Sequence, residues 1–217
     1  MEEKVGFTSS DGVCLSGVIY IPALPTDTSY LLVHPFTYLG GSCSVMTHLA
    51  NKICRSANAV CFAIDLRGAG SSSGSSTLTG YIEADDVASA CRYIRATYPE
   101  FSKKLFLVGY SAGACISGSA IPADAAGFIG IAYPCGYVAS ILLGGHPEAL
   151  RMFRGPKLFI SGSSDLFTST SRLEFMFGNL DNCKFEILPG LGHFDIIQRT
   201  NTLANLIIAF SNRPCNT

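Results

Sequence analysis

Ser111 stands between two glycines in the pentapeptide Gly109-Tyr110-Ser111-Ala112-Gly113. Residues 104–110 before it predict a buried strand, and residues 112–121 after it predict a helix. A nucleophilic serine must stand clear of a sheet on a sharp strand-to-helix turn, and the two glycines remove side chains that would collide there. The free amides at the start of the helix favour developing negative charge. We therefore predict that Ser111 is the nucleophile of an acyl-transfer reaction.

The pentapeptide in this context resembles the nucleophile elbow of the α/β hydrolases, and the resemblance covers nearly the whole chain. It implies an α/β fold with a mostly parallel central sheet of about eight strands, helices on both faces and a minimal cap. It also implies a serine, an acid and a histidine in that chain order, with no metal and no organic cofactor. Because the chain shows no linker and no repeat, we expect a single domain over residues 1–217.

His193 is the predicted general base. Of the four histidines, only His146 and His193 follow the serine. His193 lies in the glycine-rich stretch Pro189-Gly190-Leu191-Gly192-His193, directly after a predicted strand at 184–188, where family members commonly place Gly-His. His146 follows no predicted strand and is the weaker alternative.

Asp165 is the predicted acid, because it follows a strand at 157–162 and a Gly/Ser turn. An ionised carboxylate there would accept a hydrogen bond from the imidazole and stabilise the imidazolium. Asp165 could instead cap the following helix. Asp181, in a turn before the last strand, and Asp195, at a helix start, are its rivals.

The oxyanion hole requires two backbone donors. The amide of Ala112, next to the nucleophile, is one candidate. The loop after the strand at 30–34 should supply the other, and Pro35 has no N–H, so we assign it to Phe36. The His-Pro opening of this loop resembles that of a set of small α/β hydrolases, and His34 is then an organiser of the loop.

Two further stretches carry polar residues. Residues 65–74 resemble the family's Arg-Gly-x-Gly-x-Ser loop, and their glycine spacing does not fit a dinucleotide fingerprint. Asp85 and Asp86 fall on the helix before the nucleophile strand, which favours a solvated or loop-anchoring role over catalysis.

The elements that position these residues alternate between strand and helix, which indicates a parallel sheet with crossover helices. An antiparallel hairpin is predicted first, from 5–8 and 13–21. Further strands are expected at 30–34, 59–65, 104–110, 127–133, 157–162 and 184–188. Helices are expected at 44–57, 79–98 with Thr79 as its cap, 112–121, about 137–143, 171–177 and 194–210.

Composition excludes several classes of partner. Hydrophobic residues make up 48% and charged residues 14% of the 217, so a large core is expected. A net charge of -1 without charged blocks argues against nucleic acid or an acidic membrane surface as partner.

The nine cysteines, without a Cys-x-x-Cys pair, are expected to be free thiols rather than metal ligands or disulfides. No signal-peptide pattern or membrane-length apolar run occurs, so we expect a cytoplasmic protein.

These features predict a carboxylesterase-like serine hydrolase that acts on a small, near-neutral ester or thioester through an acyl-enzyme. A peptidase or amidase of the same fold is one alternative, and a non-catalytic binding module that keeps the fold is another. The short segment 134–154 offers little length for a lid, which favours a short acyl group.

Overall fold

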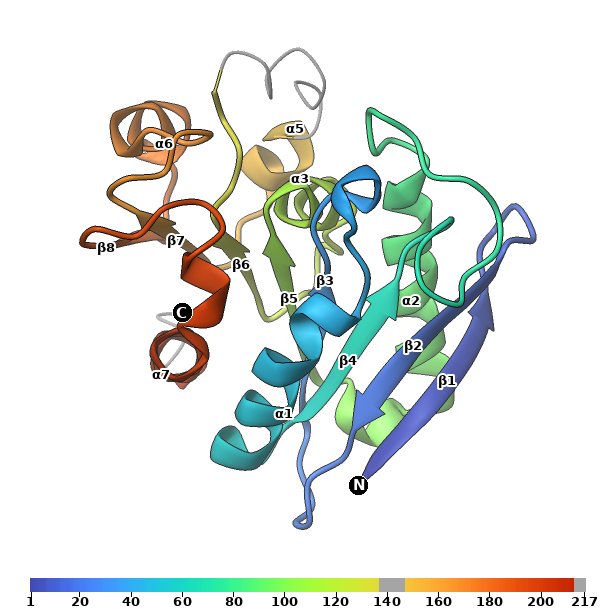
Figure 1. Ribbon diagram of the computed structural model, residues 1–217. Coiled ribbons are helices and arrows are strands. Elements are labelled where there is room, and N and C mark those ends of the chain that lie inside the picture. Colours follow the sequence, from blue (N-terminus) through green and yellow to red (C-terminus); the bar gives the residue numbers. More distant parts are fainter. Residues whose placement is uncertain (137–146, 213–217) are drawn as a thin grey trace.

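The computed structural model describes residues 1–136 and 147–212 and shows an eight-stranded sheet in the order β1-β2-β4-β3-β5-β6-β7-β8 (Figure 1). β2 runs antiparallel to both β1 and β4, and the strands from β4 to β8 are parallel to one another. The strands are β1 (Glu2–Thr8), β2 (Cys14–Tyr20), β3 (Thr28–Val33), β4 (Val60–Asp65), β5 (Lys104–Tyr110), β6 (Gly127–Ile131), β7 (Lys157–Gly162) and β8 (Cys183–Leu188). The expected hairpin and mostly parallel sheet are confirmed.

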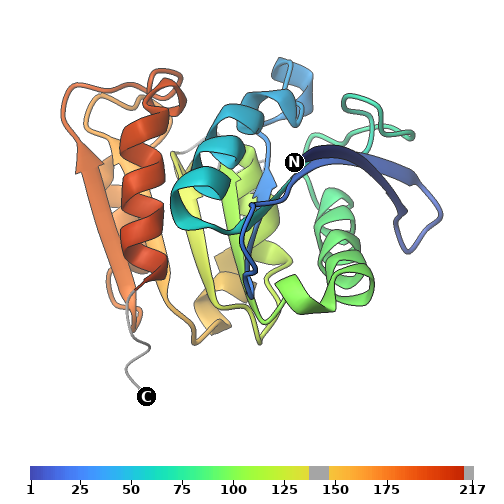
Figure 2. The ribbon, with the colours of Figure 1, turned by 90° about the horizontal axis from the view of Figure 1, so that it is seen from below.

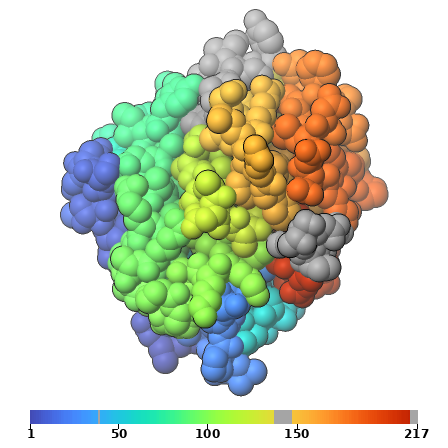
Figure 3. Space-filling model, turned by 180° about the vertical axis from the view of Figure 1, so that it is seen from behind, coloured from blue at the N-terminus to red at the C-terminus, as the bar shows by residue number. Residues whose placement is uncertain are grey.

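Helices cover both faces of the sheet. α1 and α7 pack together on one face, and α2, α3, α5 and α6 lie on the other (Figure 2 and Figure 3). The helices are α1 (Ser44–Ala57), α2 (Glu83–Thr97), α3 (Ala112–Ser119), α5 (Pro147–Met152), α6 (Thr170–Phe177) and α7 (Thr200–Ser211), with short 3₁₀ turns η1 (Thr37–Leu39), η2 (Pro99–Phe101) and η3 (Ile196–Gln198). Because both faces are covered, the inner strands are buried along nearly their whole length and read as continuous apolar runs.

Two predicted helices begin later than expected. α2 begins at Glu83 and not at Thr79, because the backbone and hydroxyl of Thr77 both donate to the Glu83 carboxylate and fold residues 77–82 into a turn. The C-terminal helix is split, since Arg199 has a non-helical ψ of 47° between η3 and α7. The helix predicted at about 137–143 lies outside the described residues.

The eight cysteines that the structure describes are free thiols, and Cys215 lies outside the described residues. Burial raises the pKa of several of these thiols, to about 12 for Cys91 and Cys115. Within the described ranges, no helix is long and apolar enough to cross a membrane.

The carboxyl ends of the parallel strands all lie at one edge of the sheet, at the top of Figure 1. The loops after β3, β5, β7 and β8 therefore meet there, although they are far apart in sequence. Ligands of open α/β sheets bind at this edge.

Candidate active site

Ser111 lies on a strained turn between β5 and α3, with φ 54° and ψ −128°. Its backbone geometry depends on the flanking glycines. A Cβ on Gly109 would lie 2.3 Å from the Cα of Ala114, and one on Gly113 would lie 2.2 Å from the carbonyl oxygen of His34. No side chain fits at either position, so both glycines are required for the turn.

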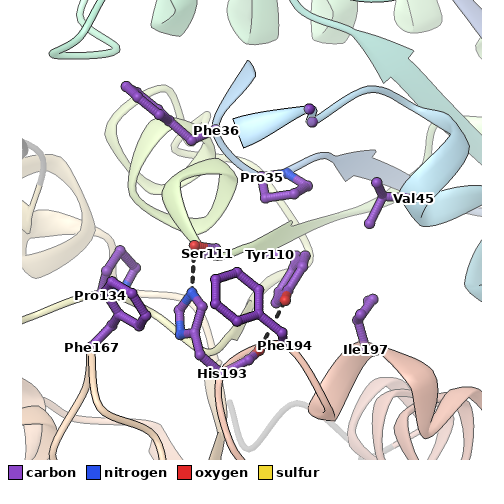
Figure 4. Close-up of a pocket in the computed structure, with 12 residues that line it drawn as sticks. Pro35, Phe36, Val45, Tyr110, Ser111, Pro134, Phe167, His193, Phe194 and Ile197 are labelled. Atoms are coloured by element: carbon purple, nitrogen blue, oxygen red, sulfur yellow. Dashed lines mark hydrogen bonds between the residues drawn. The ribbon is translucent and has the colours of Figure 1, made fainter. Parts of the chain in front are cut away.

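Ser111, His193 and Asp165 form a continuous line of hydrogen bonds. Ser111 Oγ lies 2.7 Å from His193 Nε2 (Figure 4), and His193 Nδ1 lies 2.8 Å from Asp165 Oδ2. The histidine and the aspartate are both buried. A neutral imidazole with its proton on Nδ1 satisfies both contacts, donating to the carboxylate and accepting from the serine hydroxyl.

The second oxygen of Asp165 is held by the backbone of its own loop. Oδ1 accepts from the amide of Phe167 at 2.8 Å and from that of Thr168 at 3.1 Å. The Thr168 hydroxyl in turn donates to the carbonyl of Tyr133 at 2.6 Å, which fixes the loop to the end of β6. Asp165 therefore does not cap α6; Ser169 does, by accepting from the amide of Arg172.

The rival residues lie elsewhere. Asp181 lies in the turn before β8, at the opposite edge of the sheet from Ser111. Asp195 accepts from the amide of Gly192 and thereby stabilises the base loop. His146, the alternative base, lies outside the described residues.

Aromatic side chains surround the imidazole of His193. Tyr110 stacks on it with ring centroids 6.0 Å apart, and Phe167 and Phe194 approach it at 4.7 and 5.2 Å. The hydroxyl of Tyr110 also donates to the backbone carbonyl of His193 at 2.9 Å (Figure 4). Burial raises the pKa of Tyr110 to about 12, so this donor keeps its proton. These contacts restrain the position of the base from three sides.

The loop after β3 lines the same cavity as the serine. His34 is fully buried, and its Nε2 accepts from the amide of Leu66 at 3.0 Å while Nδ1 donates to the carbonyl of Pro35 at 2.6 Å. Burial lowers the pKa of His34, which keeps the ring neutral in this role. The amide of Gly41 closes the loop on the carbonyl of Phe36.

Phe36 and Ala112, the two predicted oxyanion donors, both lie beside Ser111. Phe36 lines the same cavity as the serine, and Ala112 begins α3 directly after it. Within the described part of the chain, neither backbone amide donates to another protein group. Both are therefore available to an oxygen bound at Ser111.

A cavity of about 240 Å³ opens beside Ser111 and His193. It is lined by Pro35, Phe36, Gly40, Gly41, Val45, Tyr110, Ser111, Pro134, Phe167, His193, Phe194 and Ile197 (Figure 4). Apart from Ser111, His193 and the hydroxyl of Tyr110, these residues contribute apolar side chains or, as glycines, none. The cavity therefore suits an uncharged, apolar group.

The Arg-Gly loop after β4 supports the site without facing the cavity. Arg67 is buried; its Nε and Nη2 donate to Asp86, and its Nη1 and Nη2 donate to Asp11. Asp86 is thus a loop anchor. Asp65 accepts from the amide of Cys43 at 2.7 Å, which ties this loop to the start of α1.

Sequence reasoning missed the aromatic enclosure of the base. Phe167 lies two residues after the acid and Phe194 directly follows the base, so adjacency to the predicted acid and base was the available signal. Tyr133, which follows β6, is buried in the core against Phe159 and Phe177.

Comparison with solved structures finds several α/β hydrolases of similar fold. An α/β serine hydrolase without a lid from Xanthomonas campestris is 22% identical, with a TM-score of 0.79 over 96% of this chain and 93% of that one. An esterase from Pyrococcus furiosus is 18% identical, with a TM-score of 0.80 over 97% and 91%. An α/β serine hydrolase homologue from Coxiella burnetii is 22% identical, with a TM-score of 0.78 over 95% and 96%.

No family model matches the sequence, and no curated protein matches it. The similarity is therefore one of structure, and it extends over nearly the full length of each chain compared. This chain has the α/β-hydrolase fold, as its sequence predicted.

Proposed function

We propose that this protein is a serine hydrolase that cleaves a small carboxylic ester or thioester. The observation that carries the proposal is the unbroken hydrogen-bonded line from Ser111 Oγ through His193 to the buried carboxylate of Asp165. Similarity to esterases and serine hydrolases of the same fold supports it.

The proposed reaction has two halves. Ser111 Oγ attacks the acyl carbon while His193 Nε2 takes the hydroxyl proton, and Asp165 stabilises the resulting imidazolium. The tetrahedral intermediate collapses as the imidazolium gives its proton to the departing alcohol or thiol, which leaves an acyl-serine. Water then attacks the acyl-serine, His193 accepts a water proton, and transfer of that proton to Ser111 Oγ releases the carboxylic acid.

We propose the amides of Phe36 and Ala112 as the donors that bind the oxyanion. Their support is position: Phe36 lines the cavity, Ala112 starts the helix at the serine, and both amides lack another partner among the described residues. Loss of one such donor costs about 10²–10³ in kcat in enzymes of this kind. No metal or cofactor takes part in this scheme.

The substrate we propose carries a short, uncharged acyl group, because the cavity is small and apolar. The test is a panel of p-nitrophenyl acetate, butyrate and palmitate, a matched acetyl thioester and a matched acetyl anilide. We expect turnover of the short esters or of the thioester, and no turnover by Ser111→Ala. Faster turnover of the anilide would indicate an amidase, and no turnover of any member by the wild type would favour a non-catalytic module.

A further inference from the structure

Five exposed apolar side chains stand on the loops at the carboxyl edge of the sheet, and two of them, Phe167 and Phe194, line the cavity. Leu166 is 95% exposed and Leu78 is 56% exposed, and Tyr38, Phe167 and Phe194 are also exposed. We call these five residues the apolar collar. Leu166, Phe167 and Phe194 stand on the acid and base loops, and Tyr38 and Leu78 stand on the loops after β3 and β4.

The collar is continuous with the lining of the cavity on both sides. On one side, the ring of Tyr38 lies 5.5 Å from that of Phe36, and its hydroxyl donates to the carbonyl of Ser76 in the loop that bears Leu78. On the other side, the rings of Phe167 and Phe194 are 5.8 Å apart, and both line the cavity. In Figure 4, Phe36 lies above Ser111, whereas Phe167 lies beside His193. Apolar surface thus runs outward from the serine on both sides.

Charge is nearly absent from the loops that form this face. Residues 34–43, 66–82, 132–136, 163–169 and 189–195 contain Arg67, Asp165 and Asp195 as their charged residues. Arg67 is buried in its ion pair with Asp86, and Asp165 is buried against His193. Asp195 is therefore the one charged residue of these loops that is exposed. A binding surface for an acidic or a basic partner would need charges of the opposite sign here.

We propose that the apolar collar docks this protein onto an uncharged lipid surface, from which the ester substrate enters the cavity. This inference rests on the proposed function and extends it: the acyl group is short, and the rest of the substrate is apolar and partitions into lipid. Exposed apolar groups around a binding site mark surfaces that other molecules cover. Loops that carry a single exposed charge match a neutral lipid surface better than an anionic one.

A second copy of the chain fits this face less well, because it would cover the mouth of the cavity. A lipid surface covers the same face and at the same time supplies the substrate. Apolar side chains also supply binding free energy at a lipid surface, because each exposed leucine that enters lipid increases partitioning roughly tenfold.

The test is co-sedimentation of Ser111→Ala protein with phosphatidylcholine vesicles, which separates docking from turnover. We expect the protein to bind, and we expect Leu78→Asp and Leu166→Asp, each added to Ser111→Ala, to weaken binding roughly tenfold. Leu24→Asp is the matched control, because Leu24 is 66% exposed in the loop between β2 and β3, at the other edge of the sheet. It should leave binding unchanged. Circular dichroism and urea unfolding of all three variants should match those of Ser111→Ala alone, which shows that each variant folds.

Three results would overturn the proposal. The first is no binding to phosphatidylcholine vesicles, or binding only when anionic lipid is added. The second is an equal loss of binding from Leu24→Asp. The third is a dimer, seen by light scattering, that Leu166→Asp dissociates, because the collar would then be the interface between two copies. If vesicles bind but no ester is turned over, the docking surface stands and the proposed function fails.

Discussion

At the scale of the residue, each polar atom in the line from Ser111 to Asp165 is fixed by a different part of the chain. The serine is held by the turn between β5 and α3, the imidazole by the Tyr110 hydroxyl and three aromatic rings, and the carboxylate by two backbone amides. Because the carboxylate has one oxygen for the imidazole and one for its own loop, it cannot rotate without losing hydrogen bonds.

Asp165→Asn should lower kcat about 10⁴-fold while leaving the fold intact. The amide keeps a similar shape but carries no charge, so the imidazolium that forms during the reaction loses its stabilisation. Steady-state kinetics on the best ester of the panel, with circular dichroism, measure both effects. Asp181→Asn and Asp195→Asn are the matched controls and should change kcat by less than about tenfold. A severe effect of Asp181→Asn would contradict the assignment of the acid.

Tyr110→Phe should lower kcat about threefold to tenfold with little change in KM. The substitution keeps the aromatic ring beside the imidazole and removes the hydrogen bond to the backbone of His193, which is worth about 0.5–1.5 kcal/mol. A purely structural loss would reduce the amount of folded enzyme and leave the pH profile of kcat unchanged. A shifted alkaline or acidic limb of that profile in Tyr110→Phe would identify a positioning effect on the base. Wild-type kcat and pH profile would contradict it.

At the scale of the element, the site consists of loops at the carboxyl ends of parallel strands, and the strands were the easiest parts to predict. Continuous apolar runs identified β5 and β7 with correct bounds, because strands covered on both faces admit few polar residues. The start of α2 was missed, because the contact between Thr77 and Glu83 depends on a turn that propensity does not reveal. The acid and the base could be assigned because chain order and strand ends restrict the choice. The aromatic enclosure could not, because it depends on how separate loops pack.

Gly113→Ala should destabilise the protein by about 3 kcal/mol and abolish turnover. The added Cβ would overlap the backbone of His34, which a side-chain rotation cannot relieve, so the loop after β3 or the elbow must move. Urea unfolding measures the loss of stability. Gly6→Ala in β1 is the matched control, since its Cβ would meet one backbone oxygen at 3.8 Å, and we expect a change within about 0.5 kcal/mol. A Gly113→Ala variant as stable and active as Gly6→Ala would show that the elbow does not need this contact.

At the scale of the whole molecule, two layers of helices cover the sheet, and the high apolar content of the sequence is largely buried between them. The cysteines follow the same pattern: Cys61, Cys91 and Cys115 are buried in the two cores, and Cys14 is exposed. Composition predicted the large core and the free thiols. It could not predict the apolar collar, because exposure is a property of the folded chain and not of residue type.

N-ethylmaleimide at pH 8 should label Cys14 in the native protein and spare Cys91 and Cys115. Both buried thiols have a pKa of about 12, far above that pH, so they stay protonated and out of reach. Peptide mapping by mass spectrometry identifies the labelled sites. After denaturation, all three should react. Rapid native labelling of Cys115 would contradict the described packing around α3 and would place a second nucleophile close to Ser111.

The central claim is that Ser111 is the activated nucleophile, and stoichiometric reaction with a fluorophosphonate tests it most directly. The predicted result is a single adduct, found by intact mass and located by peptide mapping on Ser111. Ser111→Ala should take up no label, and His193→Ala should react far more slowly, because the hydroxyl then has no base to take its proton. A native protein that forms no adduct, or an adduct on any other residue, would contradict the account.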